Sequence, residues 1–357
     1  MVTPAEGPGP TEAPGTAPPT REPRITRQTA SNARSGAPSP AYKRSALVTP
    51  DGAQMQYVVL GDGPVPVVVI PAADDGLRMA GEAAPQLARS YRRRARTHRL
   101  LVLSRRQPIP EDYTWEQHTD DYIWALEQLG WGPTILECHS AGGPIGQWMA
   151  IKRPDLVRGL ILSDTMHYPS EHTRAVVTHW RYLAREEKWA ELQWSCVEYS
   201  FRPQTVARYR PRKSFLRMLP RPRHPERVVR IYDELLALDN RAVVPRIACP
   251  TLVIGGEEDN VVPADVHRAM AALIPNSRLV LYPGYGHGNS QENPDYEAQV
   301  TRFVYETWEA TAQQGRGPTR DTSAHDSPGK ARSLLNSARL APEATSTPAS
   351  TPARAGG

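Results

Sequence analysis

Residues 135–146, ILECHSAGGPIG, contain the most informative pattern in this sequence. An apolar run ends in Cys138, His139 and Ser140, and small residues follow at once. A buried strand that turns directly into a helix needs small residues at the turn, because the two elements approach closely there. A serine on such a turn is held in a strained conformation with its hydroxyl exposed. The stretch therefore predicts a strand, a sharp turn that carries Ser140, and a helix.

The middle of the chain alternates between strand-like and helix-like segments. Short runs rich in Val, Ile and Leu predict strands at residues 54–60, 65–70, 100–103, 134–137, 159–162, 251–254 and 278–281. Helices are expected at residues 82–94, 115–129, 144–152, 264–273 and 294–309. Thr114 and Gln117 have the spacing of a capping box at the start of the second helix. This alternation predicts the α/β class, with a mainly parallel sheet and helices on both faces.

Composition sets the domain organisation. The first 40 residues contain nine prolines and no aromatic residue, and Ser, Thr, Pro and Ala dominate the end of the chain. Such segments bury too little apolar surface to offset chain entropy, so we expect disorder at residues 1–42 and 313–357. The expected core spans residues 43–165 and 245–312. Residues 166–244 interrupt it with a helical pattern and are predicted to form an inserted lid.

The same composition excludes several classes of protein. Three cysteines form neither a disulfide framework nor a zinc-ligand spacing, which indicates a reducing compartment and no structural metal or cofactor. The N-terminus lacks the blocks of a signal peptide, and no run of about 18 apolar residues occurs. No nucleic-acid-binding module is present. We therefore expect a cytoplasmic protein with no membrane span and no nucleic-acid partner.

Three loops resemble those of the α/β-hydrolase superfamily, and the resemblance covers about residues 54–310. Residues 138–142, CHSAG, resemble the nucleophile elbow G-x-S-x-G, with Cys138 in place of the first glycine. TLVIGGEEDNVVP, residues 251–263, resembles the loop that carries the acid of this family, and LVLYPGYGHGNSQENPD, residues 279–295, resembles the histidine loop. The resemblance implies an α/β-hydrolase fold with an inserted helical cap.

The resemblance also implies roles for single residues. Ser140 would be the nucleophile, His287 its general base, and Asp259 the acid that orients the histidine. Asp164, after the strand predicted at 159–162, is an alternative acid. The backbone N–H of Ala141 would stabilise the oxyanion, joined by that of Ala72 or Ala73 in a loop where the family usually has His-Gly.

These residue types point to acyl transfer through a serine ester. Epoxide hydrolases and haloalkane dehalogenases of this fold attack through an aspartate, whereas this chain has Ser140 at that position. The sequence therefore predicts an esterase or thioesterase that acts on a small apolar ester or thioester. Two alternatives stay open. One is an acyltransferase or cyclase with the same triad, and the other is a ligand-binding protein with little turnover.

Two further patterns allow more than one interpretation. Six aromatic residues between Trp180 and Phe201 indicate either an apolar acyl site or the interior of the lid. Residues 202–230 hold ten Arg or Lys and one acid, Glu226. That segment is either a solvated face or a docking surface for an acidic carrier protein or a phosphate-bearing thioester. Six arginines at residues 89–99 lie at a predicted helix end, where the dipole favours positive charge.

Overall fold

The computed structural model of the protein describes residues 41–314. Predictions of disorder for residues 1–40 and 315–357 therefore lie outside the described residues. The segments predicted to be disordered, residues 1–42 and 313–357, extend a few residues too far into the fold. A strand begins at Tyr42, and the last helix ends at Gln314. No helix in the described range is both long and apolar enough to cross a bilayer.

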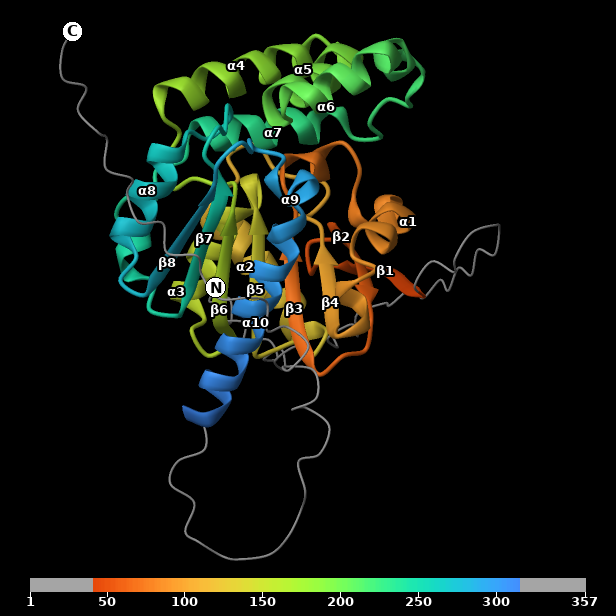
Figure 1. Cartoon of the computed structure of the whole chain (residues 1–357). Helices are drawn as coiled ribbons and strands as arrows, with labels where there is room; N and C mark the ends of the chain where they lie inside the picture. The colour runs from red at the N-terminus through yellow and green to blue at the C-terminus, as the bar shows by residue number, and fades with distance from the viewer. Residues whose placement is uncertain (1–40, 315–357) are drawn as a thin grey trace, which may run out of the picture. The chain divides into compact units, whose positions relative to one another are not determined.

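Eight strands form one sheet in the order β1-β2-β4-β3-β5-β6-β7-β8 (Figure 1). The strands are β1 Tyr42–Val48, β2 Gln54–Leu60, β3 Val65–Ile70, β4 His98–Leu103, β5 Thr134–His139, β6 Val157–Ser163, β7 Thr251–Gly256 and β8 Ser277–Tyr282. The β1–β2 and β2–β4 pairs are antiparallel, and the pairs from β4 through β8 are parallel. All six residues of β3 are buried, as expected for a parallel strand covered on both faces.

The described residues form helices that cover both faces of the sheet and further helices in the insertion between β6 and β7. They are α1 Ala80–Ser90, α2 Trp115–Gln128, α3 Gly143–Lys152, α4 Glu171–Arg185, α5 Trp189–Ser200, α6 Pro203–Tyr209, α7 Pro225–Leu236, α8 Ala264–Leu273, α9 Asn289–Glu292 and α10 Pro294–Gln314. Side chains of α2, α3 and α8 pack into one apolar cluster, and those of α1 and α10 pack into a second cluster. Figure 1 shows α1 and α10 on the near side of the sheet. The predicted α/β-hydrolase architecture is confirmed.

Most predicted elements agree with the structure, and two differences have physical causes. Strand β1 was missed because Lys43, Arg44 and Ser45 interrupt its apolar pattern, and only Leu47 is buried. The helix predicted at 82–94 ends instead at Ser90, and η2 (Arg94–Arg96) follows as a separate turn. The Thr114–Gln117 capping box is present as predicted.

Between β6 and β7 the chain leaves the sheet and forms α4, α5, α6, η4 (Arg210–Met218) and α7. These helices lie within residues 166–244, for which an insertion is predicted. Figure 1 shows them in one group across an end of the sheet. Because β6 runs parallel to β5 and β7, the insertion starts at the edge where the carboxyl ends of these strands meet.

Candidate active site

The turn after β5 has the geometry of a nucleophile elbow. Ser140 has a φ of 44°, in the left-handed region that residues with a side chain rarely adopt. It begins the short turn η3 (Ser140–Gly142), which continues directly into α3. A Cβ atom on Gly142 would lie 2.4 Å from the carbonyl oxygen of Ile70. Glycine at this position therefore allows the end of β3 to approach the elbow closely.

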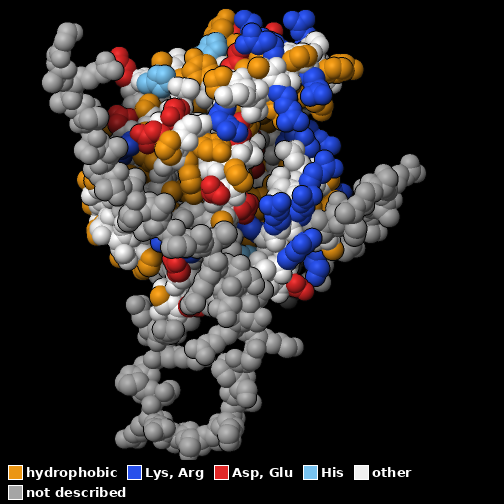
Figure 2. Space-filling view, viewed as in Figure 1, with side chains coloured by type: hydrophobic (Ala, Val, Ile, Leu, Met, Phe, Trp, Pro, Cys, Tyr) orange, Lys and Arg blue, Asp and Glu red, His pale blue; other side chains and the backbone are white. Residues whose placement is uncertain are grey.

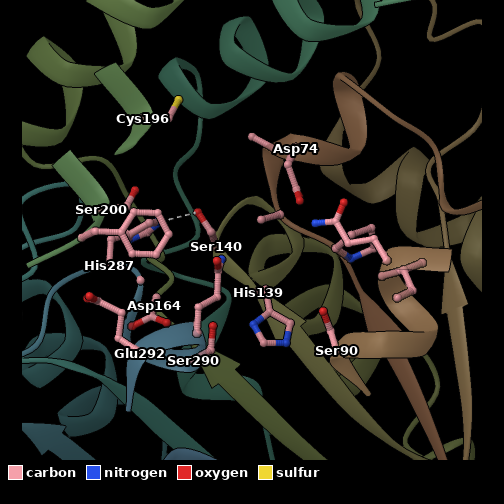
Figure 3. Close-up of a pocket in the computed structure, with 18 of the residues that line it drawn as sticks. Asp74, Ser90, His139, Ser140, Asp164, Cys196, Ser200, His287, Ser290 and Glu292 are labelled. Carbon is pink, nitrogen blue, oxygen red and sulfur yellow. Dashed lines mark hydrogen bonds between the residues drawn. The ribbon is translucent and has the colours of Figure 1, made fainter. Parts of the chain in front are cut away.

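Three side chains form a hydrogen-bonded chain above the elbow. The Nε2 atom of His287 lies 3.0 Å from Ser140 Oγ (Figure 3), and its Nδ1 atom lies 2.9 Å from Asp259 Oδ2. The other carboxylate oxygen of Asp259 accepts hydrogen bonds from the backbone N–H groups of Val261 and Val262, both at 2.8 Å. The structure thus brings together all three residues that the sequence singled out.

Burial and charge act in opposite directions on His287. Burial disfavours the imidazolium, but the charge of Asp259 and its hydrogen bond outweigh this and raise the pKa of His287 above its usual 6.5. The side chain is 12% exposed, whereas that of Asp259 is fully buried. An imidazole held in this way can accept a proton from Ser140 and stay stabilised while charged.

Asp164 lies beside this chain of hydrogen bonds, and its own contacts are different. Ser163 Oγ donates to its Oδ2 at 3.1 Å, while its Oδ1 has no hydrogen-bond partner within residues 41–314. No hydrogen bond joins Asp164 to His287. Burial raises the pKa of Asp164, the nearby charge of His287 lowers it, and that of Asp259 raises it. Of the two candidate acids, Asp259 is therefore the one whose contacts favour a carboxylate against the histidine.

The peptide that links Ser140 to Ala141 is held from one side. Thr165 Oγ1 donates a hydrogen bond of 2.6 Å to the carbonyl oxygen of Ser140. In a trans peptide the carbonyl and the following N–H point in opposite directions. The N–H of Ala141 therefore points away from the Thr165 hydroxyl, and the hydrogen bond fixes this orientation.

The loop of Ala72 and Ala73 is held in a similar way by Arg105, which is fully buried. Its Nη1 donates to the carbonyl oxygens of Pro71 and Ala72, both at 3.3 Å, and its Nη2 donates to that of Ala141 at 2.7 Å. One guanidinium thus fixes peptides on both sides of the predicted oxyanion site. Sequence reasoning missed Arg105, because nothing near it in the chain indicates that it is buried.

Arg105 is part of a buried network that reaches the insertion. Asp75 forms an ion pair of 3.5 Å with Arg105 and a shorter one with Arg227 of α7. Arg227 also donates to the carbonyl oxygen of Arg105 at 3.0 Å. The sequence interpretation of residues 202–230 as an exposed basic face is wrong for Arg227, which is 1% exposed. An isolated buried arginine is costly, so the chain pairs it with Asp75 and backbone carbonyls.

A cavity of about 1050 Å³ opens above Ser140 and His287. On the side of the insertion it is lined by Trp180, Cys196, Val197, Phe201, Leu216 and Tyr232. Figure 3 shows Cys196 and Asp74 on one side of Ser140, and Ser90 and Ser290 on the other. The aromatic residues of the insertion serve two purposes, because Trp180 and Phe201 line this cavity while Trp189 and Trp194 are buried without lining it.

Comparison with known proteins places the chain among hydrolases. A family model described as the alpha/beta hydrolase family matches residues 67–300. A protein of Klebsiella pneumoniae named "Putative carbamate hydrolase RutD" is 28% identical over 198 residues, which cover 53% of this chain and 71% of that protein. Polyketide synthase ThaQ of Burkholderia thailandensis is 28% identical over 290 residues, covering 78% of this chain and 13% of the synthase. A hydrolase structure from Pseudomonas aeruginosa superimposes with a TM-score of 0.59 at 24% identity, over 73% of this chain and 98% of that chain.

Proposed function

The chain belongs to the alpha/beta hydrolase family, and on that premise we propose that it is a serine hydrolase that cleaves a carboxylic ester or thioester. The observation that carries the proposal is the hydrogen-bonded line Asp259–His287–Ser140 at the floor of the cavity. A serine hydroxyl is a weak nucleophile unless a base removes its proton during attack. In this proposal His287 is that base, and Asp259 holds its tautomer and stabilises the imidazolium.

The reaction proceeds in two acyl transfers. Ser140 Oγ bonds to the substrate carbonyl carbon, its proton passes to His287 Nε2, and the carbonyl electron pair moves to oxygen. When the oxyanion collapses, the bond to the alcohol or thiol breaks and the leaving group takes the proton from His287. Water then attacks the serine ester by the same route and regenerates free Ser140.

The oxyanion is stabilised by backbone N–H groups. Ala141 supplies one donor, and Ala72 or Ala73 supplies the second. The contacts of Thr165 and Arg105 with the adjoining carbonyls support this assignment, because they orient these peptides before a substrate arrives. Preorganised donors cost no reorganisation when the charge develops. The Pro71–Ala72–Ala73 loop thereby serves where the family usually has His-Gly.

Residues 166–244 form a lid over this site in our proposal. Side chains of α4, α5, η4 and α7 line the cavity together with Ser140. Burial of the substrate beneath them excludes water and strengthens electrostatic contacts with the developing charge. Trp180, Leu216 and Tyr232 would contact an apolar acyl or alkyl group. Docking of an acidic carrier protein on residues 202–230 stays a prediction.

A second candidate function is acyl-chain release to a nucleophile other than water. Similarity to part of a polyketide synthase favours it. The similar region covers 78% of this chain. Both candidates use the same serine ester, so the acceptor alone separates them. Product analysis with added alcohols of increasing size distinguishes them, since a transferase yields the new ester in preference to the free acid.

Turnover of matched substrates tests the proposal. Ethyl esters and N-acetylcysteamine thioesters of acyl chains from acetyl to decanoyl would be incubated with wild type and with Ser140→Ala. We expect hydrolysis by wild type, a preference for apolar chains, and loss of turnover in the variant. Folded wild type that turns over none of these substrates in a Ser140-dependent manner would contradict the proposal and favour a ligand-binding protein.

A further inference from the structure

One wall of the cavity carries a group of free positive charges. Arg89, Arg92 and Arg93, from the end of α1 and the turn after it, line the cavity that contains Ser140. All three side chains are exposed. Within the described residues 41–314, none of the three forms an ion pair or a side-chain hydrogen bond. Their guanidinium groups are thus available to a ligand.

The acids on the neighbouring walls have other partners, although the charge of Arg93 also acts on Glu297. Glu292 forms an ion pair of 3.4 Å with the Arg202 side chain. It also accepts a hydrogen bond of 3.1 Å from the backbone N–H of Arg202. Glu297 pairs with Arg94 at 3.7 Å. Glu137 is buried and is bonded by Arg94 and by His139, the latter at 3.0 Å. The end of the cavity at α1 therefore carries a positive excess.

The opposite end of the cavity is different in character. Trp180, Val197, Leu216 and Tyr232 of the insertion make it mainly apolar. Two further acids of the cavity, Asp74 and Asp164, form no ion pair within residues 41–314, and Figure 3 shows Asp74 above Ser140 and Asp164 below it. Ser140 thus lies between an apolar end and a basic end. A volume of about 1050 Å³ is at the upper limit for small-molecule sites, so one elongated molecule can contact both ends.

We propose that the substrate is amphipathic and that Arg89, Arg92 and Arg93 bind an anionic group, a phosphate or carboxylate, at the end of the molecule away from its apolar part. The inference rests on the proposed function, because it places the scissile carbonyl at Ser140 between the two ends. Guanidinium groups match both kinds of anion, since their planar donors bind two oxygens at once.

The surface outside the cavity favours the approach of an anion. Figure 2 shows Lys and Arg side chains in a band from the insertion down the side of the molecule near α1. A second cavity of about 950 Å³ shares Leu77 and Gln193 with the first and adds Arg44, Arg78, Arg221 and Arg223. Arg221 and Arg223 form ion pairs with Glu187 and Glu82. Clustered charge of one sign raises the local concentration of an oppositely charged ligand.

Equilibrium binding to the Ser140→Ala protein tests the inference without requiring turnover. Calorimetric titrations would compare hexanoyl-coenzyme A with the N-acetylcysteamine thioester of hexanoate, which lacks the phosphates. A second pair, monoethyl adipate and ethyl hexanoate, differs by one carboxylate. We expect at least one anionic probe to bind about tenfold or more tightly than its neutral match, as one charged hydrogen bond allows. The pair that shows the preference identifies the anion.

Charge reversal then locates the site. In the Arg92→Glu/Arg93→Glu double variant we expect loss of the preference for the anionic probe, with unchanged affinity for the neutral one. Arg96→Glu is the matched control, because Arg96 is exposed on the same turn but does not line the cavity. Equal binding of both members of each pair, including no binding by either, overturns the inference. So does an equal loss of preference in the control variant.

The same measurements separate this inference from the proposed function. If wild type hydrolyses neutral esters through Ser140 and the anionic preference is absent, the anion site fails and the hydrolase stands. If the anionic probe binds through Arg92 and Arg93 and no ester is turned over, the anion site stands and the hydrolase fails.

Discussion

Gly146 and Cys138 share one space behind the nucleophile elbow: a Cβ atom on Gly146 would lie 2.3 Å from Cys138 Sγ. The family pattern has a glycine at the position of Cys138, and this chain instead has the thiol there and no side chain on the facing helix. Burial raises the pKa of the Cys138 thiol well above its usual range, so the thiol stays protonated. Cys138 is therefore a packing residue of the elbow.

Gly146→Ala tests this relationship. The new methyl group forces Cys138 or α3 to shift, and overpacking of this kind costs about 1–3 kcal/mol of unfolding free energy. Cys138→Gly in the same chain should restore most of the loss, because it removes the clashing sulfur. Urea unfolding of wild type, both single variants and the double variant gives the coupling energy. Additive effects of the two substitutions would show that the residues do not compete for space.

The pH profile should reflect His287. The base must be neutral to accept the proton of Ser140, and its pKa is raised above 6.5 in the folded enzyme. Activity should therefore be full at pH values above the raised pKa and should fall as pH decreases through it. The acidic limb of kcat/KM, measured with a neutral ester, should have an apparent pKa above 6.5. A midpoint below that value would mean that burial outweighs Asp259.

The two candidate acids should respond very differently to substitution. Asp259→Asn removes the charge that stabilises the imidazolium and should lower kcat by about 10³- to 10⁴-fold. Asp164→Asn is the matched change at a carboxyl that does not bond His287, and it should lower kcat by less than about tenfold. Single-turnover rates on both variants check this. A larger loss in the Asp164 variant would transfer the role to that residue.

Thr165 should affect the stabilisation of the oxyanion in the transition state rather than the affinity for the substrate. Thr165→Val removes the hydroxyl that holds the Ser140 carbonyl and leaves the N–H of Ala141 less well oriented. We expect kcat to fall by about 10- to 100-fold, below the loss typical of a deleted donor, with KM nearly unchanged. Thr165→Ser keeps the hydroxyl and should retain most of the activity. Thr165 would have a structural role only if KM rose by the same factor as kcat falls in Thr165→Val, or if Thr165→Ser lost as much activity.

Local patterns were sufficient to predict the parts of the fold and site that depend on neighbouring residues. The buried strands have continuous apolar runs, and the elbow, acid and histidine loops each have their signal within about a dozen residues. The supports of the site were not predictable in this way. Arg105 contacts Ala141, 36 positions away, and Arg227 contacts Asp75, 152 positions away. A single sequence does not reveal which distant charges become buried partners.

The same distinction explains the two errors in the elements near α1. The helix ends at Ser90, and Arg94, further along, is buried against Glu137 of β5. Strand β1 pairs with β2 along seven residues although only Leu47 among them is buried. In both cases a tertiary contact decides the local structure, which periodicity alone does not show.

Labelling with a fluorophosphonate probe reports whether Ser140 is an activated nucleophile, because the probe reacts with an activated serine whatever the natural substrate is. Wild type, Ser140→Ala and His287→Ala would be labelled, and the modified peptide identified by mass spectrometry. We expect labelling at Ser140 in wild type, none in Ser140→Ala, and strongly reduced labelling in His287→Ala. Unmodified Ser140 in folded wild type, or equal labelling without His287, would contradict it.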